Sequence, residues 1–329
     1  MPELYDVTAI GNAIVDVIAP AEEGFVEKHG FTKGAMNLID EAQATALYAD
    51  MAPGIETSGG SAGNTVAGVA SFGGKAAFLG KVAPDQLGEV FAHDMRAIGA
   101  AFDTAPLTGG PATARSLINV TPDGQRTMCT FLGASTHFSP ADIDRPLIEA
   151  SKIVYLEGYL FDAEAARRAF EEVAKIGQAA GRMIAMTLSD PFVVERHRDD
   201  LLAFIDEGVD LLFANEEEAK SLFRTDDFEE AVSRLRGRVK IAAVTRSEKG
   251  SVAVTAAETY AVPAAPVEKV VDTTGAGDQY AAGFMFGLAG GRPLDACARL
   301  GSLAAAEVIS HYGPRPQVPL KDLAAREGL

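Results

Sequence analysis

Residues 272–278 read Asp-Thr-Thr-Gly-Ala-Gly-Asp and are followed by a run of mostly small and apolar residues, 279–285. This order is typical of a loop that enters a helix N-terminus, where free backbone N–H groups and the helix dipole bind anions. Residues 275–277 carry no bulky side chain, which lets a phosphate approach the backbone. Asp278 would repel that anion, so we predict that it abstracts a proton from a hydroxyl attacking a phosphoryl group. The simpler interpretation is a first-turn carboxylate that complements the dipole.

A second glycine-rich stretch, Gly59-Gly60-Ser61-Ala62-Gly63-Asn64, comes directly before a helix-like run. Its small residues let a ligand lie against the backbone, and Ser61 and Asn64 carry hydrogen-bonding groups that suit sugar hydroxyls. A turn in which Ser61 caps the following helix explains the pattern equally well. Both interpretations stand for this loop alone.

Strand-like and helix-like segments alternate along most of the chain. Strands are expected at 7–10, 76–82, 153–156, 183–188, 209–214 and 241–245, and helices at 41–51, 62–72, 86–98 and 163–179. Such alternation indicates an α/β protein with a doubly wound, mostly parallel sheet and helices on both faces. Ligands of these sheets bind at the carboxyl ends of the strands.

Residues 113–132 depart from this alternation. Two β-like runs, 116–120 and 126–131, flank the sequence Thr-Pro-Asp-Gly at 121–124. Pro-Asp-Gly between such runs is typical of a β-hairpin. The sequence therefore predicts a small β-structure within the α/β chain.

The composition excludes several classes of function. The 329 residues carry a net charge of −17 and no cluster of Lys and Arg, which argues against nucleic acid as a partner. Cys129 and Cys297 are far apart and the five histidines are scattered, so neither a disulfide framework nor a zinc site is predicted. No apolar stretch suits a membrane span, and residues 1–6 lack the features of a signal peptide. We expect a cytoplasmic protein, either a monomer or a homodimer, with no membrane partner.

In combination, the motifs resemble those of the PfkB, or ribokinase-like, family of small-molecule kinases. The sequence has neither a P-loop motif nor a G-x-G-x-x-G after its first strand, so the kinase scaffold must be a different one. The resemblance extends from about residue 6 to residue 316. It is carried by 59–64, 272–278, Gly11-Asn12 with Asp16, and Asn-x-x-Glu at 215–218. Residues 9–16 and Gly59-Gly60-Ser61 make the adenosine kinases the most similar members.

The resemblance implies a ribokinase-like three-layer α/β/α fold with a small β-sheet lid. The large domain would comprise residues 1–13, 41–108 and 137–329, and the lid would comprise 14–40 and 109–136. Closure of such a lid excludes water and so prevents wasteful hydrolysis of ATP. Arg126 would reach the phosphates when the lid closes, although a solvated strand arginine is almost as good an interpretation.

The resemblance also implies roles around the acceptor. Asp278 would be the general base, and the backbone N–H groups of Gly275, Ala276 and Gly277 would form an anion hole. Asp16 would accept hydrogen bonds from two ribose hydroxyls, although a turn residue at a strand end is the simpler explanation. The other acceptor-binding residues would be Asn12, Gly59, Gly60, Ser61 and Asn64.

For the phosphoryl donor, the resemblance implies ATP with Mg²⁺. Asn215 and Glu218 would organise the metal ion through water, because Mg²⁺ dehydrates reluctantly. A capping box at the start of a helix explains the same two residues equally well. The ATP-contacting turn of the family matches residues 245–250, with Thr245, Ser247 and Gly250 as nucleotide-binding residues.

Position 274 bears on the identity of the acceptor. Animal-type adenosine kinases carry Asn at the third position of the 272–278 motif, whereas Thr274 stands here, as in many bacterial sugar kinases of the family. Asp272 and Thr274 also resemble positions near a monovalent-cation site in ribokinases, which makes K⁺ a candidate activator. We predict transfer of the ATP γ-phosphoryl group to a hydroxymethyl group of a nucleoside, with adenosine and ATP giving AMP and ADP. The alternatives are a sugar kinase acting on ribose, fructose or 2-keto-3-deoxygluconate, and a non-catalytic nucleoside-binding protein.

Overall fold

The computed structural model describes residues 5–329. Residues 1–4 lie outside the described residues, and they belong to the segment 1–6 that lacks the features of a signal peptide. Its larger sheet has the strand order β13-β12-β11-β10-β9-β8-β1-β5. These strands are β1 (Tyr5–Ile10), β5 (Ala76–Leu79), β8 (Ser151–Glu157), β9 (Met183–Thr187), β10 (Leu211–Asn215), β11 (Ile241–Thr245), β12 (Ser251–Val254) and β13 (Thr259–Val262). Neighbours from β5 to β11 pair in parallel, and β12 and β13 extend one edge in antiparallel pairing.

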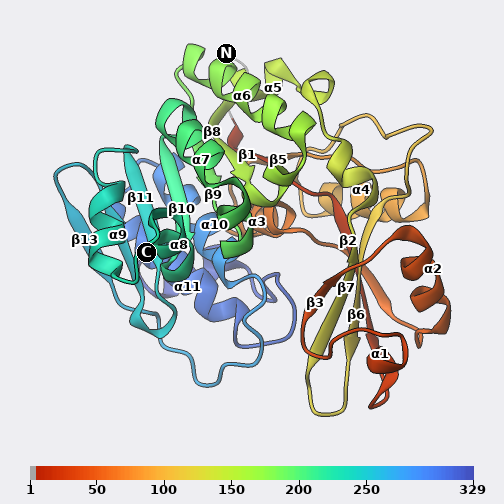
Figure 1. Cartoon of the computed structure of the whole chain (residues 1–329). Helices are drawn as coiled ribbons and strands as arrows, with labels where there is room; N and C mark the ends of the chain where they lie inside the picture. Colours follow the sequence, from red (N-terminus) through yellow and green to blue (C-terminus); the bar gives the residue numbers. More distant parts are fainter. Residues whose placement is uncertain (1–4) are drawn as a thin grey trace.

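Helices cover both faces of this sheet, as Figure 1 shows. The helices of the chain are α1 (Phe25–Lys28), α2 (Glu41–Asp50), α3 (Ser61–Ser71), α4 (Gln86–Ala97), α5 (Arg145–Glu149), α6 (Glu164–Ala179), α7 (Pro191–Gly208), α8 (Glu216–Phe223), α9 (Phe228–Leu235), α10 (Ala276–Ala289), α11 (Leu294–Val308) and α12 (Leu320–Arg326). One apolar core joins alternate strand residues such as Tyr155 to α3, α10 and α11. The other joins the opposite strand face, including Leu156, to α6 through α9. The alternation predicted from the sequence is confirmed, and the fold is a three-layer α/β/α architecture.

A second, smaller sheet lies beside the first, at the lower right of Figure 1, with the strand order β3-β7-β6-β2-β4. Its strands are β2 (Ile14–Pro20), β3 (Met36–Leu38), β4 (Ile55–Ser58), β6 (Ala114–Val120) and β7 (Arg126–Phe131). The predicted hairpin is present, because β6 and β7 pair antiparallel with Val120 opposite Arg126.

The membership of the small sheet differs from the expected domain boundaries. Strand β4 pairs antiparallel with β2, although residues 41–108 were expected to belong to the large domain. Helix α2, within the same range, packs on β6 and β7. After α2 the chain adds strand β4 to the small sheet, and only then enters α3 and returns to the large sheet at β5.

The carboxyl ends of several parallel strands carry polar residues. Glu157 ends β8, and Asn215 ends β10 directly opposite Thr245 at the end of β11. Helices α3 and α10 pack against each other on one face of the sheet. No helix within residues 5–329 has both the length and the apolar character required to span a membrane.

Candidate active site

The 272–278 run forms the entry into α10, as the sequence predicts. Gly275 caps the helix with φ 80°, a left-handed conformation that favours glycine, and a Cβ there would lie 2.7 Å from Pro314. The N–H group of Ala276 donates to the Thr273 carbonyl at 3.2 Å. Among the described residues, no acceptor pairs with the N–H groups of Gly275 or Gly277. Two of the three predicted anion-hole donors are thus free, and the third is engaged in a turn.

Asp278, in the first turn of α10, meets the second glycine-rich loop. Ser61 donates its hydroxyl to Asp278 Oδ1 at 2.6 Å, and Asn64 donates its amide to Oδ2 at 3.2 Å. Burial raises the pKa of Asp278 to about 6, against the lowering effect of these hydrogen bonds and of Arg315. Two loops more than 200 residues apart in sequence therefore meet at one carboxylate.

Asp16, on β2 of the small sheet, is a second buried carboxylate at this place. A Cβ on Gly59 would lie 2.4 Å from Asp16 Oδ2, so the loop backbone runs directly beside the carboxylate. Gly60 has φ 80°, and a Cβ there would lie 2.3 Å from the Asn12 carbonyl. Burial raises the pKa of Asp16 to about 6, opposed by Arg315 and Arg126. No group in residues 5–329 donates a hydrogen bond to the Asp16 side chain, so its oxygens can accept bonds from a ligand.

Asn12 is oriented by other residues of the protein. Its amide donates to Glu157 Oε1 at 2.7 Å, and its carbonyl accepts from the Ser135 hydroxyl at 2.8 Å. Glu157 also accepts from the backbone of Ala62, in the first turn of α3, at 2.9 Å. Burial raises the pKa of Glu157 to about 7, while these hydrogen bonds lower it. Glu157 therefore ties the 11–12 turn to the 59–64 loop.

Asn215 and Glu218 form the capping box at the start of α8. Asn215 Oδ1 accepts from the Glu218 backbone at 2.8 Å, and the Asn215 backbone and amide donate to the Glu218 carboxylate at 2.9 and 2.7 Å. Burial raises the pKa of Glu218 to about 7, with a further contribution from Asp190. The simpler of the two sequence interpretations is present in the structure, and it places both side chains at the carboxyl end of β10.

The 245–250 turn lies next to this box. Ser247 has φ 51°, and Gly250 donates its N–H to the Ser247 carbonyl at 3.0 Å. Arg246 donates to Glu216 at 3.0 Å and stacks on the Phe228 ring at 3.7 Å from its centroid. Arg246 thus fastens the turn to the N-terminal ends of α8 and α9.

Arg126 joins the small sheet to the 272–278 loop. Its guanidinium forms an ion pair with Asp272, and both side chains are largely buried. Asp272 also accepts from the N–H and hydroxyl of Thr274, at 3.0 and 2.6 Å, and from the Gly313 N–H at 3.0 Å. Burial opposes ionisation of Asp272, but the bonds from Thr274 and Gly313, together with Arg126, lower its pKa on balance.

Two residues at this site carried no recognisable signal in the sequence. Arg315 donates to Asn64 Oδ1 at 3.3 Å and to the Ser58 hydroxyl at 2.8 Å. Glu157 stands at the end of a strand that reads as plain core. Neither belongs to a motif, and only the general rule that ligands bind at the carboxyl ends of parallel strands could have indicated Glu157.

Comparison with known proteins gives one family match and several similar relatives. The sequence profile of the pfkB family of carbohydrate kinases matches residues 54–321. The chain belongs to this family. A solved adenosine kinase from Sinorhizobium meliloti is 54% identical, with a TM-score of 0.90 and 99% of each chain covered. A probable sugar kinase from Rhizobium etli CFN 42 is 49% identical, with a TM-score of 0.92 and 99% of each chain covered.

A more distant relative extends the comparison. The adenosine kinase of Saccharomyces cerevisiae is 26% identical over 330 residues, which covers 93% of this chain and 95% of the relative. This pfkB-family kinase is thus a phosphotransferase that acts on a hydroxyl acceptor, and its family implies ATP as the donor.

Proposed function

We propose that the protein is an ATP-dependent adenosine kinase that phosphorylates the hydroxymethyl group of the nucleoside and releases AMP and ADP. The observation that carries the proposal is the pair of buried carboxylates, Asp278 at the free N-terminus of α10 and Asp16 without a protein donor. The first suits a base beside an anion site, and the second suits a pair of hydroxyls. The likeness to the Sinorhizobium meliloti enzyme, itself named an adenosine kinase, supports the nucleoside as acceptor.

The acceptor would lie between the glycine loop and the small sheet. Asp16 would accept hydrogen bonds from two ribose hydroxyls, while the glycines at 59 and 60 keep the backbone close enough to contact the sugar. Asn12 would act mainly by holding the 11–12 turn, because Glu157 and Ser135 already occupy its amide.

Phosphoryl transfer would then take place at the start of α10. As the acceptor oxygen forms its bond to the γ-phosphorus, its proton passes to Asp278, and the bond to the β–γ bridging oxygen breaks to release ADP. The N–H groups of Gly275 and Gly277 would stabilise the charge on the transferred group. A base with its pKa raised to about 6 is ionised at neutral pH and still accepts a proton effectively.

The residues at the end of β10 fit a hydrated magnesium ion. Glu218 is a buried carboxylate whose oxygens each accept one bond from Asn215 and keep a lone pair for a further donor. That donor set suits metal-bound water better than direct coordination, in keeping with the slow dehydration of Mg²⁺. When bound, Mg²⁺ would neutralise charge on the phosphates of ATP. Thr245, Ser247 and Gly250 would line the nucleotide beside it.

The small sheet would serve as a lid over the acceptor. Strand β2 already brings Asp16 to the site, and β7 brings Arg126 to the loop that holds the anion site. In the ternary complex Arg126 would keep Nη1 on Asp272 and donate from Nη2, which has no partner among residues 5–329, to a phosphate oxygen. A K⁺ ion at Asp272 would compete with Arg126, which already supplies a positive charge there.

A sugar kinase of the same family is the second candidate. It is favoured by Thr274 and by the 49% identity to a protein named a probable sugar kinase. Steady-state kcat/KM for adenosine, cytidine, ribose, fructose and 2-keto-3-deoxygluconate separates the two candidates. The proposal predicts adenosine as the best acceptor by at least about tenfold. Rapid turnover of a free sugar with none of adenosine would contradict it.

A further inference from the structure

Arg315 is a buried cation whose charge acts on both carboxylates of the site, Asp16 and Asp278. It belongs to the loop after α11, and its guanidinium donates to Asn64 Oδ1 and to the Ser58 hydroxyl. Asn64 in turn donates to Asp278. Because the side-chain oxygen of Asn64 accepts a hydrogen bond from Arg315, the side-chain nitrogen of Asn64 faces Asp278. A hydrogen-bonded chain therefore runs from Ser58 through Arg315 and Asn64 to Asp278.

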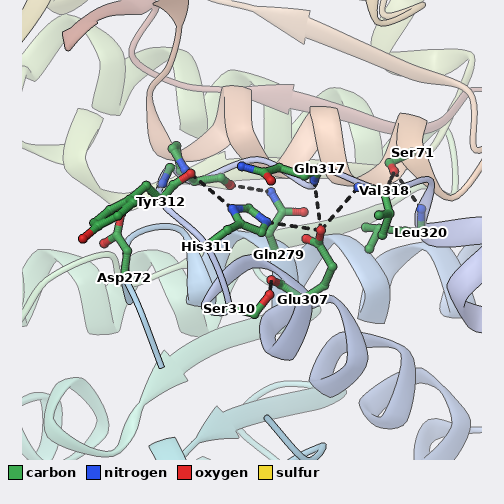
Figure 2. Close-up of polar contacts among 12 residues, drawn as sticks. Ser71, Asp272, Gln279, Glu307, Ser310, His311, Tyr312, Gln317, Val318 and Leu320 are labelled. Atoms are coloured by element: carbon green, nitrogen blue, oxygen red, sulfur yellow. Dashed lines mark hydrogen bonds and ion pairs between the residues drawn. The ribbon is translucent and has the colours of Figure 1, made fainter. Parts of the chain in front are cut away.

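Hydrogen bonds hold the loop that carries Arg315, and Figure 2 shows those that Glu307 accepts from His311 and Gln317. The Glu307 carboxylate accepts from the backbone of Gln317 at 2.9 Å and from His311 at 3.2 Å. Gln279, one residue after Asp278, donates its side-chain amide to the backbone carbonyls of Pro314 at 3.0 Å and of Asn64 at 2.9 Å. The same α10 turn thus fixes the positions of Asp278, Asn64 and the Arg315 backbone.

The charge of Arg315 is balanced at a distance and not by direct contact. Among residues 5–329 it forms no ion pair, and its Nη2 is buried without a hydrogen-bond partner. A buried cation without a counter-ion costs several kcal/mol, so nearby anions must compensate it. The carboxylates that act on it are Asp16 on β2, Asp94 on α4 and Asp278 on α10.

We propose that Arg315 is a positioning residue for phosphoryl transfer: it orients the Asn64 amide toward Asp278, and its charge keeps Asp16 and Asp278 ionised together. The inference rests on the proposed function and assigns this role to a residue outside every motif of the sequence. Without the guanidinium, two buried carboxylates would face each other across the acceptor, and one of them would take up a proton near neutral pH.

The directions of the pKa shifts agree with this role. Arg315 is the strongest of the attractions that oppose burial and lower the pKa of Asp16, and it also lowers the pKa of Asp278. Arg126 on β7 also lowers the pKa of Asp16. Asp278 in turn raises the pKa of three neighbours on β8 and the turn after it, Tyr155, Glu157 and Tyr159. Arg315 and Arg126 are the cations of this set, so removal of Arg315 leaves Asp278 without its cation.

The test is the pH profile of kcat/KM for adenosine at saturating MgATP. In Arg315→Gln, the acidic limb should move upward by on the order of one pH unit, from Coulomb attraction at an effective dielectric constant near 20. Ionisation of the nucleotide is common to all variants and cancels in the comparison. An unshifted limb in a folded Arg315→Gln protein would overturn the proposal.

A second variant separates charge from geometry. Arg315→Lys keeps the charge, so its acidic limb should stay within about 0.3 units of the wild type, whereas kcat should fall several-fold because an ammonium lacks the guanidinium fork. If Arg315→Gln does not fold, this variant still decides: wild-type kcat, or a limb shifted by a full unit, would contradict the role. Arg198→Gln is the matched control. Arg198 is half-buried and donates to the Ser221 carbonyl at 3.0 Å, and it acts on neither carboxylate, so its profile should match the wild type.

The inference and the proposed function fail in different ways. Full activity of Asp278→Asn, or turnover of free sugars only, would refute the proposed function. Loss of activity in Asp278→Asn together with wild-type pH profiles in both Arg315 variants would refute only the role of Arg315.

Discussion

Replacement of Asp278 by Asn should lower turnover by about two to four orders of magnitude and at the same time stabilise the fold. Loss of a general base lowers kcat by about 10² to 10⁴, which corresponds to about 3–5 kcal/mol of transition-state free energy. Binding of adenosine should be nearly unchanged, because Asp16 and the glycine loop, and not Asp278, hold the sugar in the proposed complex.

The stability effect follows from the raised pKa of Asp278. Its folded-state value of about 6 lies above the ordinary 3.8, so the ionised carboxylate destabilises the fold by about 3 kcal/mol well above pH 6. This penalty shrinks as the pH falls through 6 and vanishes below about 4, where the side chain is protonated in both states. The asparagine NH₂ would meet the Asn64 amide as a second donor, which reduces the expected gain to about 1–3 kcal/mol at pH 8.

Two assays read out these effects: ADP release in a coupled spectrophotometric assay, and urea denaturation at pH 8 and pH 4.5. Asp227→Asn serves as control, because Asp227 caps α9 and asparagine caps a helix equally well. That variant should keep both activity and stability. An unchanged kcat in Asp278→Asn would refute the assignment of the base. A stability gain equal at both pH values would refute the electrostatic explanation.

Three further predictions concern the surrounding loops. Gly275→Ala should lower stability by at least about 2 kcal/mol in urea denaturation, because alanine is strained at φ 80° and its Cβ would meet Pro314; wild-type stability would contradict the backbone argument. Glu218→Gln should raise the Mg²⁺ concentration for half-maximal rate about tenfold, and an unchanged Mg²⁺ dependence would remove Glu218 from the metal site. Because burial raises the pKa of Glu218 to about 7, the same variant should be more stable to urea at pH 8, and this gain should fade below pH 7. Exchange of K⁺ for tetramethylammonium at constant ionic strength should change kcat less than about twofold, because Arg126 supplies the positive charge at Asp272; strict dependence on K⁺ would refute that reasoning.

Much of the fold could be predicted from the sequence because its signals are local. The strand at 241–245 has the predicted bounds, and the hairpin around Pro122-Asp123-Gly124 forms as expected. Strand β4 and its pairing with β2 escaped prediction, because register between distant segments depends on tertiary contacts that no local pattern encodes. The same is true of the antiparallel edge formed by β12 and β13.

In the candidate site, too, residues in local motifs could be recognised, whereas contacts between distant segments could not. The sequence assigned Ser61 and Asn64 to the acceptor and Asp278 to proton transfer, but it did not indicate that both side chains donate hydrogen bonds to Asp278. The role of Arg315 could not be predicted, since a lone arginine in a loop after the last motif has no distinctive spacing. Asn12 could be recognised from the sequence as a site residue. Its hydrogen bond to Glu157 could not be predicted, because Glu157 ends a strand 145 residues away.

In the proposed complex, one acceptor molecule lies between Asp16 and Asp278. A crystal structure with adenosine and a non-hydrolysable ATP analogue tests it most directly. We expect both ribose hydroxyls on the Asp16 carboxylate, and the hydroxymethyl oxygen within about 3 Å of an Asp278 oxygen. Adenosine bound with its ribose away from Asp16, or with the hydroxymethyl group out of reach of Asp278, would contradict it.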